Sequence, residues 1–153
     1  MADPCSAAVA IVGLGASLVT LAALVVDSYN VLKRVHASFK NAPEEIPRLC
    51  RQLAGLEGLL REVQLQVTHA DRPFSPSSRT MLTGAVDGLQ SELRGFQHTI
   101  HKLDRLLEGS VRSRHLLRLR IRHVLQEAKV KECEHKIGLQ TSHLSLVLAL
   151  SNR

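Results

Sequence analysis

The sequence predicts an all-α fold, a single domain over residues 1–153 that forms an antiparallel up-down bundle of four to five helices with an apolar N-terminal helix. Three observations support this prediction. Leucines alternate at steps of three and four in two long segments, which is the spacing of helices that pack at a shallow angle. Alternation with period two is rare, so strands have little support. The first helix-length segment, residues 5–26, contains no Asp, Glu, Lys, Arg or His.

The first predicted helix covers residues 6–40. Pro4 and Ser6 suit a helix start, and the Asn-Ala-Pro segment 41–43 stops it. Its charge-free part gives way at Asp27 to an amphipathic part, with Val31, Leu32, Val35 and Phe39 facing inward. Because the charge-free part is apolar on nearly all sides, we expect this helix to be the most enclosed member of the bundle.

The second and third predicted helices cover residues 43–70 and 77–109, with a polar, proline-containing loop at 71–76 between them. Pro43 followed by two glutamates fits a first helical turn, because acids there meet the positive end of the helix dipole. The inward seam of the second helix consists of Ile46, Leu49, Leu53, Leu56, Leu60, Val63 and Val67. That of the third consists of Leu82, Val86, Leu89, Leu93, Phe96, Ile100, Leu103 and Leu107.

A final helical block covers residues 113–151. One apolar stripe consists of Leu117, Ile121, Val124 and Ala128, and a second consists of Ile137, Leu144, Val147 and Leu148. Between the two stripes the apolar pattern weakens. We therefore expect a kink, or a break into two helices, near residues 129–136.

The apolar first helix admits three interpretations. It is long enough to cross a bilayer as a permanent anchor, with Lys33 and Arg34 placing the rest of the chain in the cytosol. It also suits the centre of a soluble bundle, because nearly half of its residues are small. Third, it can rest in the bundle and enter lipid on release, where small residues four apart allow copies of the helix to pack closely. The candidate membrane-active residues are Ala10, Gly13, Leu14, Gly15, Ser17, Leu18 and Leu21.

A basic segment at residues 110–123 gives a second candidate surface. Arg114, Arg118 and Arg122 recur every four residues and therefore line one helical face. We expect this face either to be merely solvated or to contact anionic lipid headgroups, in keeping with the net charge of +6. Nucleic-acid binding is not expected, because the segment has no interleaved aromatic residues on which bases stack.

No catalytic motif is present, and we predict no enzyme activity, cofactor or metal. The sequence lacks a phosphate-binding loop, a dinucleotide fingerprint and an HExxH pair of zinc ligands. His98 and His101 have no cysteine or carboxylate beside them at ligand spacing, so we expect them to be exposed. The three cysteines, Cys5, Cys50 and Cys133, lie far apart, which argues against a disulfide framework and favours a reducing compartment.

Three stretches of the chain resemble the N-terminal domain of fungal STAND proteins, the NOD-like receptors that carry NACHT or NB-ARC modules. They are the opening Asp3-Pro4-Cys5-Ser6, the Ala/Gly/Leu-rich helix after it, and the turn Lys40-Asn41-Ala42-Pro43-Glu44-Glu45-Ile46. The closing segment, residues 134–150, looks like the last helix of the same domain, which is often called HeLo-like. Two features depart from the family pattern: the chain has no Trp near the start of the last block, and Cys5 stands where Leu or Ile is common.

This resemblance implies a helical bundle that executes regulated cell death, in heterokaryon incompatibility or innate immunity. Such a domain rests in the cytoplasm, oligomerises under an NTPase module in the same chain or a partner receptor, and exposes its N-terminal helix to permeabilise the plasma membrane. The alternative is a soluble adaptor that binds a partner helix and never enters lipid. We expect Leu18→Glu to separate the two hypotheses, because it would unfold the adaptor but leave an effector folded.

Overall fold

The computed structural model of the protein describes residues 4–38, 42–68, 74–109 and 114–151, without the side chains of residues 4–12. Within these ranges the chain forms five helices and no strand, so the predicted all-α fold is confirmed. The helices are α1 (Pro4–Ala37), α2 (Glu45–Thr68), α3 (Pro76–Glu108), α4 (Arg114–Glu127) and α5 (Val130–Ser151).

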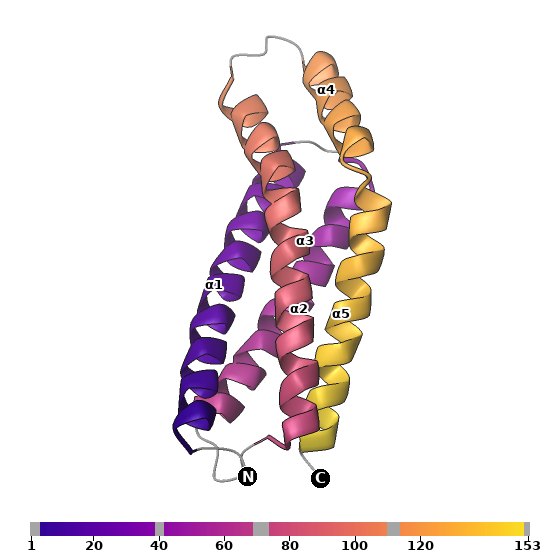
Figure 1. Ribbon diagram of the computed structural model, residues 1–153. Coiled ribbons are helices and arrows are strands. Elements are labelled where there is room, and N and C mark those ends of the chain that lie inside the picture. The colour runs from indigo at the N-terminus through magenta and orange to yellow at the C-terminus, as the bar shows by residue number, and fades with distance from the viewer. Residues whose placement is uncertain (1–3, 39–41, 69–73, 110–113, 152–153) are drawn as a thin grey trace.

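Helices α1, α2, α3 and α5 form a four-helix bundle, with α1 and α3 running one way and α2 and α5 the other (Figure 1). Both α1 and α5 pack on α2 and on α3. Within the described residues, α1 has no close backbone approach to α5, and α2 has none to α3. The order around the bundle is therefore α1, α2, α5, α3, which puts α1 and α5 at opposite corners. Helix α4 packs on α3 and α5 beyond the end of this bundle.

Local sequence signals account for the helix ends. Ser75 is the N-cap of α3, its side chain accepts a hydrogen bond from the backbone N–H of Ser78, and Pro76 lies in the first turn. Helix α3 therefore begins one residue earlier than predicted. The predicted break in the last block is confirmed at residues 128–129, where Lys129 has a φ of 51°. A residue in this left-handed conformation ends a helix, and here it separates α4 from α5.

The core is aliphatic and follows the predicted seams. Every residue predicted to face inward on α2 and α3 is buried except Val67 and Leu107, which are half-buried near the helix ends. Val31, Leu32 and Val35 of α1 and Ile137, Leu144, Val147 and Leu148 of α5 are also buried, as predicted. Phe39 lies outside the described residues.

The expectation that the apolar first helix is the most enclosed one is met only as a ranking. Eight of the 25 side chains described for α1 are buried, a share that no other helix exceeds. Yet α1, like α2, α3 and α5, packs on only two neighbouring helices of the bundle, and only 33% of its most apolar described window is buried. Its buried stripe consists of Leu14, Leu18, Leu21, Val25, Ser28, Val31, Leu32 and Val35. The opposite side of α1 faces outward and carries no charged residue from Gly13 to Val26.

Candidate functional site

The exposed side of α1 is an uncharged surface on a helix long enough to cross a bilayer. We call it the outer face of α1; it consists of Ala16, Val19, Thr20, Ala23 and Val26, all of them exposed. The side chains of Val19 and Val26 are 61% and 41% exposed. Among the described residues, α1 is the one helix whose length and composition suit a membrane span, at Gly13–Ala37. Such a segment is also found in soluble cores; here 33% of it is buried and the rest is exposed or half-buried.

A groove between α1 and α2 extends this surface. Gly15, Leu18 and Val19 line it from α1, and Arg61, Gln64, Leu65, Val67 and Thr68 line it from α2. Leu65 is 59% exposed, and Arg61 pairs with Glu57 at 2.9 Å. The uncovered apolar area therefore reaches from α1 onto the end of α2.

The predicted membrane-active residues do not share one face of α1. Leu14, Leu18 and Leu21 point into the core, Gly13 is exposed, and Gly15 and Ser17 are half-buried. Ala10 belongs to α1, but its side chain lies outside the description. Because Leu18 is fully buried, Leu18→Glu would unfold the bundle whether or not the protein acts on lipid, so this variant cannot separate the two hypotheses.

The outer face of α1 was missed, although the sequence carries a signal for it. Leu14, Leu18, Leu21, Val25 and Leu32 follow the same three-and-four spacing as the seams of α2 and α3. Assigning those large residues to the core leaves the smaller residues between them on the outside.

Three polar contacts tie α1 to α3 along its length. The side-chain amide of Gln90 donates to the backbone oxygen of Ser17 at 2.8 Å, and that of Gln97 donates to Asp27 at 2.9 Å. The guanidinium of Arg34 pairs with Asp104 at 2.6 Å. All three are on one flank, so α1 is fixed to α3 by hydrogen bonds as well as by apolar packing.

The predicted basic surface lies on α4. Arg114 and Arg122 are exposed and Arg118 is half-buried, and Arg120 adds a third exposed arginine. In the part of the chain that is described, none of these four arginines forms an ion pair. Leu116 and Leu119 are 44% and 48% exposed beside them. Exposed leucines among arginines are typical of helices that lie at the surface of an anionic membrane.

The two candidate surfaces are separated along the bundle axis, because α4 lies beyond one end of the bundle (Figure 1). Ser17 is held at the height of Gln90, whereas the side chain of Lys102, twelve residues farther along α3, lies 4.0 Å from Glu127 at the end of α4. With a rise of about 1.5 Å per residue, the arginines of α4 are more than about 20 Å from Ser17. The structure therefore does not bring the two predicted sets of lipid-binding residues together.

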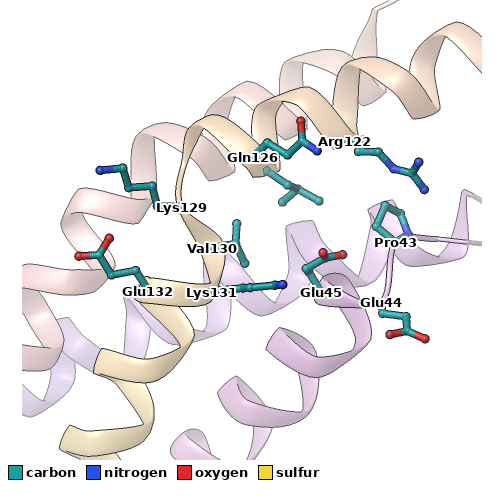
Figure 2. Close-up of a pocket in the computed structure, with 10 residues that line it drawn as sticks. Pro43, Glu44, Glu45, Arg122, Gln126, Lys129, Val130, Lys131 and Glu132 are labelled. Carbon is teal, nitrogen blue, oxygen red and sulfur yellow. The ribbon is translucent and has the colours of Figure 1, made fainter.

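A hollow of about 680 Å³ lies where α4 and α5 meet the start of α2. Figure 2 shows Arg122 and Gln126 facing Pro43 and Glu45, whereas Lys129 and Glu132 point away. Among the described residues, its lining mixes both signs of charge and contains no His, Cys, Ser or Thr. His98 and His101 are exposed, as expected, and the described residues contain no group of three metal-ligating side chains.

The two described cysteines are poor nucleophiles. Burial, reinforced by Glu92 and Glu134, raises the pKa of the Cys133 thiol to about 11. Burial also raises the pKa of Cys50, although nearby Lys33 opposes the shift. Both groups stay protonated at neutral pH, and the thiolate is the reactive form.

Comparison of the chain with protein-family models, curated proteins and solved structures finds no match. The resemblance to HeLo-like domains therefore stays a prediction.

Proposed function

We propose that this domain acts on membranes: copies associate, α1 exchanges its place in the bundle for lipid, and the plasma membrane becomes permeable. In this proposal the domain rests in the cytoplasm as the N-terminal effector of a NOD-like receptor, and an NTPase module in the same chain or a partner receptor brings copies together. The observation that carries the proposal is the uncharged outer face of α1, uncovered on a helix of membrane-spanning length.

Energetics decide how α1 leaves the bundle. Its inner stripe buries seven apolar side chains at 7% exposure or less, and transferring each to water costs about 1.5–3 kcal/mol. The sum, roughly 10–20 kcal/mol, is as large as the whole stability of an ordinary domain. Release into water would therefore unfold the bundle. Release into lipid avoids this cost, because the bilayer interior takes up the same leucines.

One buried polar group destabilises the packing of α1 in the bundle. The hydroxyl of Ser28 is fully buried and has no hydrogen-bond partner among the described residues. An unsatisfied buried polar group costs about 1–3 kcal/mol. The inner face of α1 is thus less stable in the bundle than a purely aliphatic stripe would be.

Helix α4 supplies the first contact with the membrane in this proposal. Its unpaired arginines attract anionic headgroups, and each is worth about 1 kcal/mol near such a surface. Because α1 remains packed on α2 and α3 along the length of the bundle, docking through α4 does not by itself place α1 in the bilayer. Association of copies and the departure of α1 from α3 then follow as separate steps.

A reducible crosslink tests whether α1 has to leave. In a chain with Cys5→Ser, Cys50→Ser and Cys133→Ala, cysteines at Asp27 and Gln97, whose side chains touch, join α1 to α3. The protein is oligomerised through an inducible dimerisation tag and added to dye-filled vesicles containing about one fifth phosphatidylserine. We expect no leakage while the crosslink is intact and normal leakage after reduction. Full leakage from the crosslinked protein would contradict the proposal.

A matched pair of variants tests the α1 surface. Ala23→Glu places a charge on the outer face of α1, whereas Ala54→Glu makes the same change at an exposed alanine of α2. Both should fold, as circular dichroism will show. A glutamate in a membrane span costs several kcal/mol, so we expect Ala23→Glu to reduce leakage at least about tenfold and Ala54→Glu to leave it unchanged.

One observation favours the alternative function, a soluble adaptor. Leu18, Leu21, Val25 and Leu32 are fully buried, so α1 is an integral part of the core. A partner helix laid on the outer face of α1 would then convey a signal without any insertion. The crosslinked protein separates the two functions, because an adaptor would bind its partner equally well before and after reduction.

A further inference from the structure

Two uncovered apolar faces stand at opposite corners of the bundle. Helices α1 and α5 both pack on α2 and α3 and not on one another, so their outer faces point in opposite directions (Figure 1). We define the outer face of α5 by Lys131, His135, Leu139, Ser142, Leu146 and Leu150, all exposed. From Ile137 to Ser151 this helix has no Asp, Glu, Lys or Arg, so both corners expose uncharged surface.

The two faces differ in the size of their side chains. The α5 face carries Leu139, Leu146 and Leu150, which are 44–50% exposed. The α1 face carries Ala16, Thr20 and Ala23, with the groove at Gly15 and Val19 beside it. Large side chains on one helix fit between small ones on another, which allows the two backbones to approach closely.

Contacts with α3 show the relative positions of α1 and α5 along the bundle axis. Gln90 binds the backbone of Ser17, and the side chain of Gln140 lies over Gly88, only two residues away on α3. Lys136 pairs with Glu92 at 3.5 Å. Ala16 and Thr20 on α1 therefore lie at about the height of Leu139 and its neighbours on α5.

The same heights place one acidic and one basic side chain opposite each other. Asp27 lies at Gln97, five residues beyond Glu92 on α3. Because α5 is antiparallel to α3, the residue of α5 at the height of Gln97 lies five positions before Lys136 and is therefore Lys131. Asp27 and Lys131 are both exposed, at the same height, at the ends of the two uncharged faces.

We propose that copies of the chain associate head to tail, with the outer face of α1 of one copy on the outer face of α5 of the next. When a second copy is placed beside the first by a translation perpendicular to the bundle axis, Ala16 and Ala23 of one copy meet the leucines of α5 of the other. The same translation brings Asp27 of one copy against Lys131 of the other. This contact is heterologous, because each copy uses two different surfaces, and it therefore continues from copy to copy. It deepens the proposed function, since it names the surfaces through which the copies meet, but its test uses no lipid.

Mixing two blocked variants tests the interface. Ala23→Glu blocks the α1 face and Leu146→Glu blocks the α5 face, and circular dichroism and thermal melting should show both folded because both positions are exposed. In analytical ultracentrifugation at rising concentration we expect the natural chain and Ala54→Glu to form oligomers. Each blocked variant alone should stay monomeric, its association weakened by about 100-fold or more. An equimolar mixture should form a one-to-one dimer, because each partner keeps one intact face.

A charge exchange provides an independent readout. Asp27→Lys and Lys131→Asp should each weaken association roughly 3- to 10-fold, and the two changes in one chain should restore it.

Three outcomes would overturn the interface: a natural chain that stays monomeric at every concentration, blocked variants that do not dimerise on mixing, or a Leu146→Glu variant that still assembles. Association without vesicle leakage would overturn the proposed function and leave the interface standing. Leakage by a chain that stays monomeric would overturn the interface.

Discussion

Helices α1 and α5 pack on the same two neighbours from opposite corners, yet their uncovered sides differ. Both bury a stripe of large aliphatic residues, Leu18 and Leu21 in α1 and Leu144 and Val147 in α5. Outside, α1 presents small residues and valines whereas α5 presents leucines. The comparison teaches that the inner stripe makes a helix part of this fold, and that the outer side is free to serve binding.

The largest effects are expected on the inner stripes. Leu18→Ala in α1 and Leu144→Ala in α5 each remove a fully buried side chain, so each should lower the free energy of unfolding by about 2–5 kcal/mol in urea denaturation. Leu146→Ala, at a 48% exposed position of α5, is the control and should change it by less than about 1 kcal/mol. A clearly smaller loss for Leu18→Ala would mean that α1 is not an equal member of the core.

A pH dependence of stability should come from Cys133 in α5. Cys133 is 7% exposed on the inner side of α5, and its pKa of about 11 lies above the ordinary value of 9.0. The folded state therefore holds this proton where the unfolded state releases it, so stability is full below pH 9 and falls between pH 9 and about 11. The loss is on the order of 2 kcal/mol.

Denaturation of the natural chain and of Cys133→Ala across this pH range measures the effect. In Cys133→Ala, the free energy of unfolding should fall less steeply with pH over this range, because the contribution of the thiol is gone. Equal slopes for the two proteins would show that the Cys133 thiol does not titrate with folding.

Smaller and opposite effects are expected at one glycine of each helix. A methyl group at Gly13 of α1 would meet open space, so Gly13→Ala should stabilise the protein by about 1 kcal/mol. At Gly138 of α5 it would lie 3.3 Å from the side-chain nitrogen of Gln52, which donates to the backbone oxygen of Glu134. Gly138→Ala should therefore stabilise the protein less than Gly13→Ala does, or destabilise it. Thermal melting of the two variants compares them directly, and a larger gain at Gly138 would contradict this packing.

Much of the fold could be predicted from the sequence because leucine spacing directly reports which side of a helix is buried. The seams of α2 and α3 and four inner residues of α5 were identified in this way, whereas the buried Val130 and Cys133 lay outside the predicted stripe. The uncovered side of α1 was not identified, because its apolarity hardly varies around the helix. Composition alone then cannot distinguish a central helix from one at a corner with an uncovered side.

The candidate site was only partly predictable for the same reason. The charge-free length of α1 and the arginines of α4 were visible in the sequence. The spacing of Leu14, Leu18 and Leu21 marked the core side of α1, but the prediction did not use it. Nothing in the sequence indicated that the arginines of α4 lie beyond one end of the bundle. That position depends on which helices are neighbours, and the loops leave that order undetermined.

The weak attachment of α4 has a consequence for how the molecule opens. This helix buries only Ile121 and Leu125, and the exposed pair of Lys102 and Glu127, at 4.0 Å, ties it to α3. Segments with so few buried contacts unfold locally at much lower free energy than the core. In hydrogen–deuterium exchange, the amides of α4 should exchange well before those of α2 and α3. Helix α4 would thus be able to reorient toward a charged surface while the other four helices stay folded.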